Sequence, residues 1–292
     1  MSEPLLVTIS PSRAELERKR STLREILRGM GKTLVAYSGG VDSAYLLAEA
    51  VLVLGQRAQG VIGRSPSLAE AELAGALTVA SSRGLSVRVI ETHEMDRDAY
   101  RRNGPDRCYH CKAELFERLS AIASAEGWDS LAYGAVTDDL GDVRPGMSAA
   151  ERHRVRAPLL EAGLGKLEVR TLAREMDLGV WDKPQSPCLA SRIPHGSEVT
   201  RTKLSQVERG EAWLKEAFGL RVVRLRHEGE RARIEVRPNA VARLSEPAAL
   251  SSISLQLKEL GFSQVEVDPR GYRRPDPNPA DPMEEPSDAE SR

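Results

Sequence analysis

The chain has 292 residues, and its 42 lysines and arginines nearly balance its 43 aspartates and glutamates, for a formal net charge of −1. This length is enough for two domains of roughly 100 to 200 residues each, and the near-neutral charge argues against nucleic-acid binding through bulk electrostatics. No apolar run approaches the roughly 20 residues needed to span a bilayer, and residues 1–4 lack a signal-peptide core, so we expect a cytoplasmic protein without membrane partners.

The first part of the chain alternates helix and strand patterns. In chain order these are a charged helix at about 12–30, a strand at 33–37, a helix-like stretch at 44–48, a strand at 58–63, a helix at about 67–82, a strand at 86–90, an amphipathic helix through 115–123 and a short strand at 131–134. Strands that alternate with helices predict a parallel sheet with helices on both faces. The predicted fold class is therefore α/β.

The pattern changes after about residue 198. A helix is expected at 200–218, strands at 221–226 and 232–236, a helix at 251–260 and a last strand at 263–267. These elements predict a smaller α+β domain. We place the first domain at 1–198 and the second at 199–270, and we expect 271–292, rich in proline, acids and serine, to be a disordered tail.

A glycine-containing loop joins the first strand to the following helix. It reads Ser38-Gly39-Gly40-Val41-Asp42-Ser43. Adjacent glycines allow a sharp turn that brings backbone N–H groups to an anion, and the helix start adds positive potential. The loop contains no lysine, so it does not match the Walker pattern, and Asp42 is expected to hold a magnesium ion that bridges phosphate oxygens. The alternative is an ordinary glycine turn in which Asp42 caps the helix.

Two of the three cysteines, Cys108 and Cys111, lie three positions apart at the start of the amphipathic helix. The positive helix end and the adjacent Arg107 and Lys112 favour the thiolate form. An odd number of cysteines in a long chain does not suggest a disulfide scaffold and indicates thiol, metal or cluster chemistry. Half of a zinc site, a redox pair and two half-buried thiols remain alternatives for this C-x-x-C pair.

The third cysteine, Cys188, follows Pro184 and Pro187. Because a proline disfavours helix in the residue before it, we expect an extended loop here. Cys188 is therefore predicted to be exposed enough to react.

The loop at 38–43 resembles the SGGxDS loop of the PP-loop ATP pyrophosphatases. This resemblance implies an ATP-binding fold that cleaves ATP between its α and β phosphates. Such enzymes adenylate an acceptor oxygen, release pyrophosphate, and let a nitrogen or sulfur nucleophile displace AMP. The loop alone leaves that nucleophile open.

Further strings narrow the resemblance to the LarE family. They are Asn103, RCYHCK at 107–112, DDLGDVRPG at 138–146, DKPQSPCLASRIPHG at 182–196, RLRH at 224–227 and ARIEV at 232–236, and together they extend from about residue 33 to 267. LarE proteins are ATP-dependent sulfur transferases of nickel-pincer nucleotide synthesis. The resemblance implies ATP and Mg²⁺ as cofactors and pyridinium-3,5-biscarboxylic acid mononucleotide as substrate, with a bis-thiocarboxylic product. It also implies a homo-oligomer, described as hexameric, and other enzymes of the same synthesis as candidate partners.

Cys188 matches the family's sulfur-donating cysteine. In single-cysteine members that residue gives up its own sulfur and becomes dehydroalanine, so each protein molecule is consumed. This chain also has Cys108 and Cys111, as do members that carry a [4Fe-4S] cluster. Three thiolates can hold three irons and leave the fourth to carry a replaceable sulfide. The sacrificial route through Cys188 and structural zinc or free thiols stay open.

Several other residues are candidates for the site. Arg224 and Arg226 lie two positions apart on a strand and match a basic pair that the family presents to substrate phosphate, although a solvated strand face is the alternative. Ser191 and Arg192 are expected to line the acceptor pocket. Glu211 is a weaker catalytic candidate, because a carboxylate on a charged helix is usually exposed.

Two cofactor-binding candidates come from the first domain. Ser65 follows the second strand, where PP-loop enzymes place adenosine, although a helix cap explains its neighbour Ser67 as well. Arg144 follows a strand end and is expected to contact ligand. The five histidines show no metal-ligand spacing.

Two other functions compete with sulfur transfer to the pyridinium substrate. A tRNA thiolase would share the loop and a three-cysteine cluster, but the neutral charge speaks against RNA binding. A non-catalytic nucleotide or cluster sensor would use the fold only for binding. Pyrophosphate release from ATP with the pyridinium substrate would separate the three.

Overall fold

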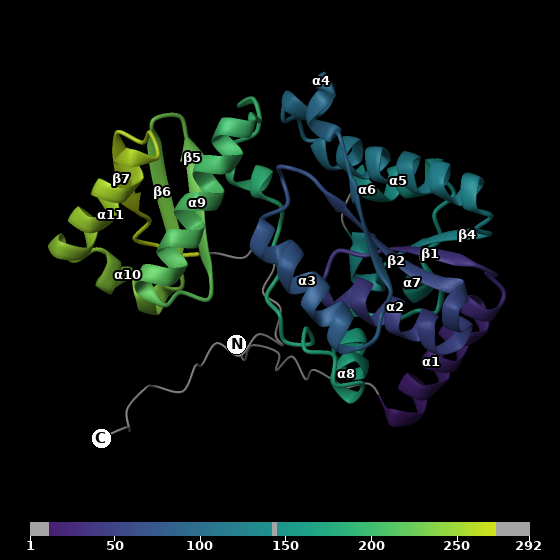
Figure 1. The fold of residues 1–292 in the computed structure, drawn as a ribbon. Coiled ribbons are helices and arrows are strands. Elements are labelled where there is room, and N and C mark those ends of the chain that lie inside the picture. The colour runs from purple at the N-terminus through teal and green to yellow at the C-terminus, as the bar shows by residue number, and fades with distance from the viewer. Residues whose placement is uncertain (1–11, 142–144, 273–292) are drawn as a thin grey trace, which may run out of the picture. The chain divides into compact units, whose positions relative to one another are not determined.

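The computed structural model describes residues 12–141 and 145–272. The chain divides into two compact units that interleave along the sequence (Figure 1). Unit 1 takes its residues from Met1–Gly63, Gly75–Ile90 and Leu115–Lys183, and unit 2 from Arg64–Ala74, Glu91–Glu114 and Pro184–Arg292. Unit 2 therefore includes three segments that the boundary at 198 had assigned to the first domain.

The described residues form helices and strands that match the expected alternation. The helices are α1 (Arg13–Arg28), α2 (Val41–Leu54), α3 (Glu70–Ser82), α4 (Asp98–Arg101), α5 (Arg107–Glu126), α6 (Pro145–Arg152), α7 (Pro158–Glu161), α8 (Lys166–Glu175), α9 (Arg201–Phe218), α10 (Pro238–Leu244) and α11 (Pro247–Glu259). The strands are β1 (Thr33–Ala36), β2 (Ala58–Arg64), β3 (Val87–Glu91), β4 (Ser130–Tyr133), β5 (Val223–Glu228), β6 (Arg231–Val236) and β7 (Gln264–Val267).

Unit 1 is built on a four-stranded sheet with the order β3-β2-β1-β4. The central strand β1 runs parallel to β2 and to β4, with Thr33 opposite Ala58 on one side and Ser130 on the other. In Figure 1, α5 lies across one face of the sheet and α1 and α2 lie on the other. The prediction of an α/β fold with a helix-flanked parallel sheet is confirmed.

Helix α1 packs onto α2 through apolar side chains and a buried ion pair. Ser12 caps α1 by accepting a hydrogen bond from the Glu15 backbone N–H at 3.2 Å, and the helix turns Leu23 and Leu27 into the core. Glu49 of α2 is fully buried, and Arg20 and Arg24 of α1 contact its carboxylate at 2.8 and 2.7 Å. Because a buried charge must be paired, this ion pair fixes the register of the two helices.

Unit 2 contains a three-stranded sheet with the order β5-β6-β7, in which β5 pairs antiparallel and β7 pairs parallel with β6. Helix α9 packs on β5, and α11 packs on β7. The core of the unit includes Leu214, Leu225, Ile234 and Leu257, and Cys111 and Cys188 are partly buried against it. The predicted α+β elements of residues 200–267 are therefore confirmed.

The sequence patterns did not indicate five helices: α4, α6, α7, α8 and α10. Most of these are short, and α8 begins after the N-cap residue Gly165, which the sequence patterns did not indicate as a helix start. The predicted tail lies outside the described residues from residue 273 onward, and so does Arg144. Among the helices that the structure describes, none is long and apolar enough to cross a membrane.

Candidate functional site

The loop between β1 and α2 in unit 1 depends on two close backbone approaches. Gly39 has a φ of +71°, and a Cβ at this position would lie 2.4 Å from the Cβ of Ala76. A Cβ on Gly134, just after β4, would lie 2.8 Å from the backbone nitrogen of Ser43. Only glycine fits at these positions, because any side chain would push the loop away from α3 or from the end of β4.

The serines of the loop hold it in shape. The Ser43 hydroxyl accepts a hydrogen bond from the Ser38 N–H at 3.1 Å, donates one to the Gly40 carbonyl at 3.1 Å and lies 3.0 Å from the Ser38 hydroxyl. Gly40 is the N-cap residue of α2 and Val41 is its first, buried residue. The loop thus precedes a 14-residue helix whose first N–H groups have no side-chain cap, a geometry that suits an anion.

Asp42 does not cap this helix, because Gly40 is the cap residue. One carboxylate oxygen, Oδ2, accepts a hydrogen bond from Lys166 Nζ, and the other, Oδ1, is buried without a hydrogen-bond partner among the described residues. Burial raises the pKa of Asp42, and Lys166 opposes that shift. A buried carboxylate oxygen with no donor is suited to a cation, as the predicted magnesium role of Asp42 requires.

Two lysines at this loop could not be predicted from the loop's own sequence. Lys166, the first residue of α8, contacts Asp42, and Lys183 Nζ lies 3.5 Å from the Gly39 carbonyl oxygen. They follow their partners by 124 and 144 positions. The loop itself contains no lysine, and these two distant lysines place positive charge beside its backbone and hydroxyl groups.

In unit 2, four arginines surround the segment 185–191, which carries Cys188. Arg107 donates to the Ala190 carbonyl at 2.9 Å, Arg192 to the Cys188 carbonyl at 3.0 Å, Arg224 to the Gln185 carbonyl at 2.8 Å and Arg226 to the Ser191 carbonyl at 2.9 Å. The segment has no helix or strand up to Cys188, as the prolines predicted, and then forms the 3₁₀ helix Leu189–Arg192. Its backbone is therefore held by the adjacent Arg192 and by three arginines from distant elements.

Arg192 and Glu211 form a buried, two-pronged ion pair. Arg192 Nε and Nη2 lie 2.8 and 3.0 Å from the two carboxylate oxygens of Glu211, and the side chains are 2% and 5% exposed. Glu211 also accepts a hydrogen bond from the Leu225 N–H at 3.0 Å. The alternative in which Glu211 faces solvent is thus wrong, and these contacts assign both residues to positioning Cys188.

Arg224 and Arg226 are not solvated as a strand face would be. Arg224 is 5% exposed and lies over the ring of Tyr272, and Arg226 also contacts Glu235 at 2.7 Å. Burial and the neighbouring Arg192 lower the pKa of Arg224. Burial and Arg192 both disfavour the positive charge of this guanidinium, so an anion such as a phosphate would stabilise it. This suits the predicted role of the pair.

Asn103 and Arg107 join the start of α5 to the segment that carries Cys188. Asn103 is fully buried with a φ of 55°, and its amide donates to the carbonyls of Ile193, Pro194 and Ser197 at 3.1, 2.8 and 3.0 Å. Arg107, the first residue of α5, bridges the Asn103 side chain and the Ala190 carbonyl. The start of α5 and the segment that carries Cys188 are thereby joined within one unit.

The state of the thiols differs from the expectation. Cys108 is exposed, whereas Cys111 and Cys188 are half-buried. Burial, followed by the nearby Glu94, raises the pKa of Cys111, and burial also raises the pKa of Cys188 although Arg107 opposes it. This raised pKa opposes the thiolate form that the sequence predicts for Cys111, because burial outweighs the positive charge of Lys112.

The two remaining predictions concern Ser65 and the metal ligands. Ser65 belongs to unit 2, where its hydroxyl lies 2.8 Å from that of Ser67. Within residues 12–141 and 145–272, no three His, Cys, Asp or Glu side chains are grouped so that they could hold a single metal ion. Asp42 and the three cysteines therefore remain predicted ligands.

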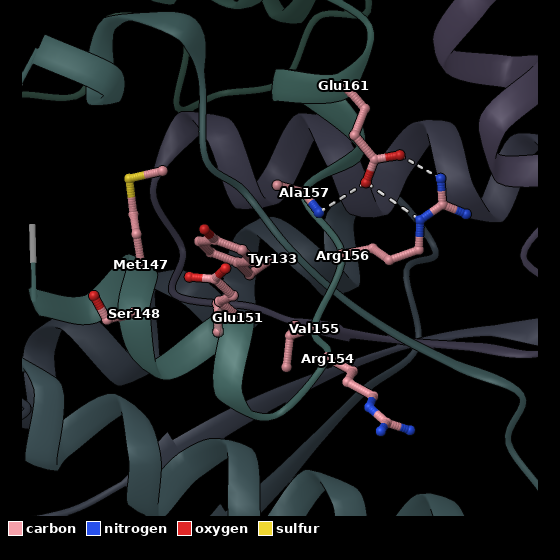
Figure 2. A pocket seen from close by; sticks show the side chains of 10 residues that line it. Tyr133, Met147, Ser148, Glu151, Arg154, Val155, Arg156, Ala157 and Glu161 are labelled. Carbon is pink, nitrogen blue, oxygen red and sulfur yellow. Dashed lines mark hydrogen bonds and ion pairs between the residues drawn. The ribbon is translucent and has the colours of Figure 1, made fainter.

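Unit 1 also has a cavity of about 530 Å³ beside β4, shown in Figure 2. Tyr133, Met147 and Glu151 line it together with Arg156, whose guanidinium bonds the carboxylate of Glu161. No residue predicted for the site lines this cavity.

Comparisons with known proteins cover almost the whole chain. No family model matches it. An uncharacterized protein of Synechocystis sp. is 39% identical over 258 residues, which cover 88% of this chain and 96% of that protein. The pyridinium-3,5-bisthiocarboxylic acid mononucleotide synthase of Lactiplantibacillus plantarum is 32% identical over 262 residues, with coverage of 89% and 94%. An uncharacterized protein of Methanocaldococcus jannaschii is 27% identical over 262 residues, with coverage of 89% and 97%.

Proposed function

The chain belongs to the LarE family of sulfur transferases in nickel-pincer cofactor synthesis, and from this premise we propose that it uses ATP to convert pyridinium-3,5-biscarboxylic acid mononucleotide into the bis-thiocarboxylic acid. The observation that carries the proposal is the 32% identity over 89% of the chain to the synthase named for that product. The loop of unit 1 and the cysteine segment of unit 2 supply the groups that such chemistry needs.

The first half-reaction activates a carboxylate. A substrate carboxylate oxygen attacks the α-phosphorus of ATP, the bond to the β-phosphate oxygen breaks, and pyrophosphate leaves with that electron pair. The N–H groups at the start of α2 and the Ser38 and Ser43 hydroxyls suit the phosphates. Lys166 supplies positive charge to the departing pyrophosphate, and Asp42 is then free to bind magnesium.

The second half-reaction delivers sulfur. A sulfur nucleophile attacks the carbonyl carbon of the acyl adenylate, the carbon–oxygen bond to the phosphate breaks, and AMP leaves with the electron pair. Arg224 and Arg226 bind the substrate phosphate in this proposal, since both guanidinium groups are fixed beside the segment that carries Cys188. Two rounds give the bis-thiocarboxylic product.

The residues fit a [4Fe-4S] cluster as the sulfur carrier. Cys108, Cys111 and Cys188 all lie in unit 2. Cys108 and Cys188 both contribute to the raised pKa of Cys111. Cluster cysteines bind different irons, so they need not be grouped as ligands of one ion. A bound metal cation would stabilise the thiolate form of half-buried thiols whose pKa is raised, because the thiolate is the form that binds metal. When bound, the cluster would supply a sulfide on the iron that no cysteine binds.

The sacrificial route uses the same segment. Cys188 Sγ would attack the acyl adenylate, AMP would leave, and loss of the Cys188 Cα proton would break the Cβ–Sγ bond. The sulfur would remain on the product and dehydroalanine on the chain. Arg192 holds the Cys188 carbonyl in either route.

The experiment is pyrophosphate release from ATP and Mg²⁺ with the pyridinium biscarboxylate, compared with release in the presence of tRNA. We expect release only with the pyridinium substrate, and loss of release in Asp42→Asn. Release that requires tRNA would indicate a tRNA thiolase. A protein that binds ATP but releases no pyrophosphate with either acceptor would be a sensor.

A further inference from the structure

The chain turns sharply after β7 in unit 2. This turn has the sequence Asp268-Pro269-Arg270-Gly271, and aspartate first, proline second and glycine fourth are typical of a β-turn. The Gly271 N–H donates to the Asp268 carbonyl at 3.0 Å, and Asp268 Oδ1 accepts from the Arg270 N–H at 2.9 Å. Gly271 has a φ of +67°, and a Cβ there would lie 2.9 Å from the Val236 carbonyl oxygen. Only glycine therefore fits this close approach to β6.

Both ends of the turn are hydrogen-bonded to β6. The Asp268 N–H donates to the Ile234 carbonyl at 2.8 Å, and the Tyr272 N–H donates to the Val236 carbonyl at 2.6 Å. Asp268 is buried and Tyr272 is half-buried. We call the segment 268–272 the β6 clip. It has a fixed place beside β6, whose neighbour β5 carries the basic pair proposed for the substrate phosphate.

Asp268 is connected to Arg226 through a chain of ion pairs. Its Oδ2 lies 2.7 Å from Nη1 of Arg233, and the same Nη1 lies 2.8 Å from Oε1 of Glu235. The other oxygen of Glu235, Oε2, lies 2.7 Å from Nη2 of Arg226. The side chains of Asp268 and Glu235 are 5% and 10% exposed, whereas that of Arg226 is 27% exposed. The guanidinium of Arg226 is thus the more exposed end of a chain whose carboxylates are buried.

The charge of Asp268 balances Arg233 in this chain. Hydrogen bonds from Arg270 lower the pKa of Asp268, burial opposes them, and a hydrogen bond from Arg233 lowers the pKa further, so Asp268 is ionised. Glu228 contacts Arg233 from another side, at 2.9 Å from Nε. Without the charge of Asp268, Arg233 would attract Glu235 more strongly, and Glu235 would hold Arg226 less firmly.

Tyr272, at the end of the β6 clip, covers the other arginine of the pair. The centroid of its ring lies 5.4 Å from Cζ of Arg224, within the range of a cation–π contact. Nη2 of Arg224 also donates to the Gln185 carbonyl at 2.8 Å. Burial and Arg192 lower the pKa of Arg224, and Glu211 and Tyr272 oppose that shift. The tyrosine therefore helps this buried guanidinium to keep its charge and its position.

The β6 clip thus contacts or is linked to both arginines. Two guanidinium groups can bind one phosphate only when both planes are correctly oriented, because their N–H donors form rigid forks. Resting on the proposed function, in which this pair binds the substrate phosphate, we infer that Asp268 and Tyr272 are positioning residues for recognition of that phosphate. Asp268 orients Arg226 through the ion-pair chain, and Tyr272 orients Arg224.

The test compares two acceptors in the full chain: pyridinium-3,5-biscarboxylic acid mononucleotide and the corresponding nucleoside, which lacks the phosphate. Initial rates of pyrophosphate release at saturating ATP and Mg²⁺ give kcat and KM for each acceptor. Asp268→Asn removes the charge but keeps an oxygen that can accept from the Arg270 N–H, and Tyr272→Leu removes the ring. We expect KM for the mononucleotide to rise about threefold to tenfold in each variant with kcat nearly unchanged. Both constants for the nucleoside should match those of the wild type.

Two further variants serve as controls. Glu266→Gln removes a carboxylate charge two positions before Asp268, but its contact at 3.2 Å is with Arg231, so KM for the mononucleotide should not change. Tyr272→Phe keeps the ring and should raise this KM less than Tyr272→Leu does. If Asp268→Asn does not fold, the two variants of the half-buried Tyr272 decide the question.

The nucleoside separates positioning from general stabilisation. Equal losses with both acceptors, or an unchanged mononucleotide KM in Asp268→Asn and Tyr272→Leu, would overturn the inference and leave the sulfur-transferase proposal standing. A wild-type chain with the same KM for both acceptors would remove the phosphate role of the arginine pair and with it the inference, but not sulfur transfer. A wild-type chain that releases no pyrophosphate with either acceptor would overturn the proposed function itself and the inference that rests on it.

Discussion

Replacing Glu211 with alanine should destabilise unit 2 strongly, because Arg192 would keep a buried charge without its partner. The pair makes two contacts of 2.8 and 3.0 Å at side-chain exposures of 2% and 5%, and the Leu225 N–H would also lose its acceptor. Breaking a buried ion pair in this way costs about 3–5 kcal/mol, a large fraction of the roughly 5–15 kcal/mol that stabilises a typical domain.

The assay is urea denaturation followed by circular dichroism, combined with sulfur transfer to the pyridinium substrate per folded molecule. The control is Glu266→Ala, which breaks a contact of 3.2 Å to Arg231 between side chains that are both 45% exposed and should change the free energy of unfolding by no more than about 1 kcal/mol. The double variant Arg192→Met/Glu211→Leu should recover much of the loss, because it removes both charges. If Glu211→Ala is as stable as the wild type but loses sulfur transfer, Glu211 acts on the substrate and the positioning role is refuted.

Three further predictions concern Lys166, Asn103 and His227. Lys166→Met should weaken ATP binding about tenfold to a hundredfold in calorimetry, as loss of a charged hydrogen bond implies, and unchanged affinity would remove Lys166 from the site. Asn103→Asp tolerates the left-handed backbone but cannot donate to three loop carbonyls, so denaturation should show a loss of about 1–3 kcal/mol, and an equal stability would contradict that role. Burial lowers the pKa of His227 below its ordinary 6.5, so its contribution to stability should be complete above pH 6.5 and be lost as the pH falls through the folded value; denaturation at several pH values should show a weaker dependence in His227→Phe.

The sequence predicted features that depend on neighbouring residues. The loop at 38–43 could be read directly, since its glycines, serines and flanking strand and helix are contiguous and the structure places Gly39 in a left-handed conformation next to α3. Most elements of both units followed from apolar periodicity for the same reason. The segment before Cys188 was correctly predicted from its prolines to be a loop and not a helix.

What could not be predicted depends on contacts between distant positions. Lys166 reaches Asp42 from 124 residues away, and nothing local marks it as part of the loop. Glu211 was a weaker candidate in the sequence, and its burial against Arg192 arises only when α9 packs beside the segment 185–191. The raised pKa of Cys111 has the same origin, since burial is a property of the folded unit.

The division into two units could not be predicted from the order of the elements along the chain. The segments Arg64–Ala74 and Glu91–Glu114 belong to unit 2 although they lie between parts of unit 1 in the sequence. A boundary drawn once along the chain cannot describe such an arrangement. This interleaving brings Glu94, Tyr100 and Cys111 into the same unit as Cys188.

Mass spectrometry of both the nucleotide product and the protein after turnover with ATP, Mg²⁺ and the pyridinium biscarboxylate tests the sulfur-transferase account most directly. The account predicts that each oxygen-to-sulfur exchange on the substrate accompanies one pyrophosphate and one AMP. With the cluster as carrier, Cys188 should keep its mass over many turnovers in the presence of sulfide. Pyrophosphate release without any sulfur on the product would show that the protein does not transfer sulfur to this substrate.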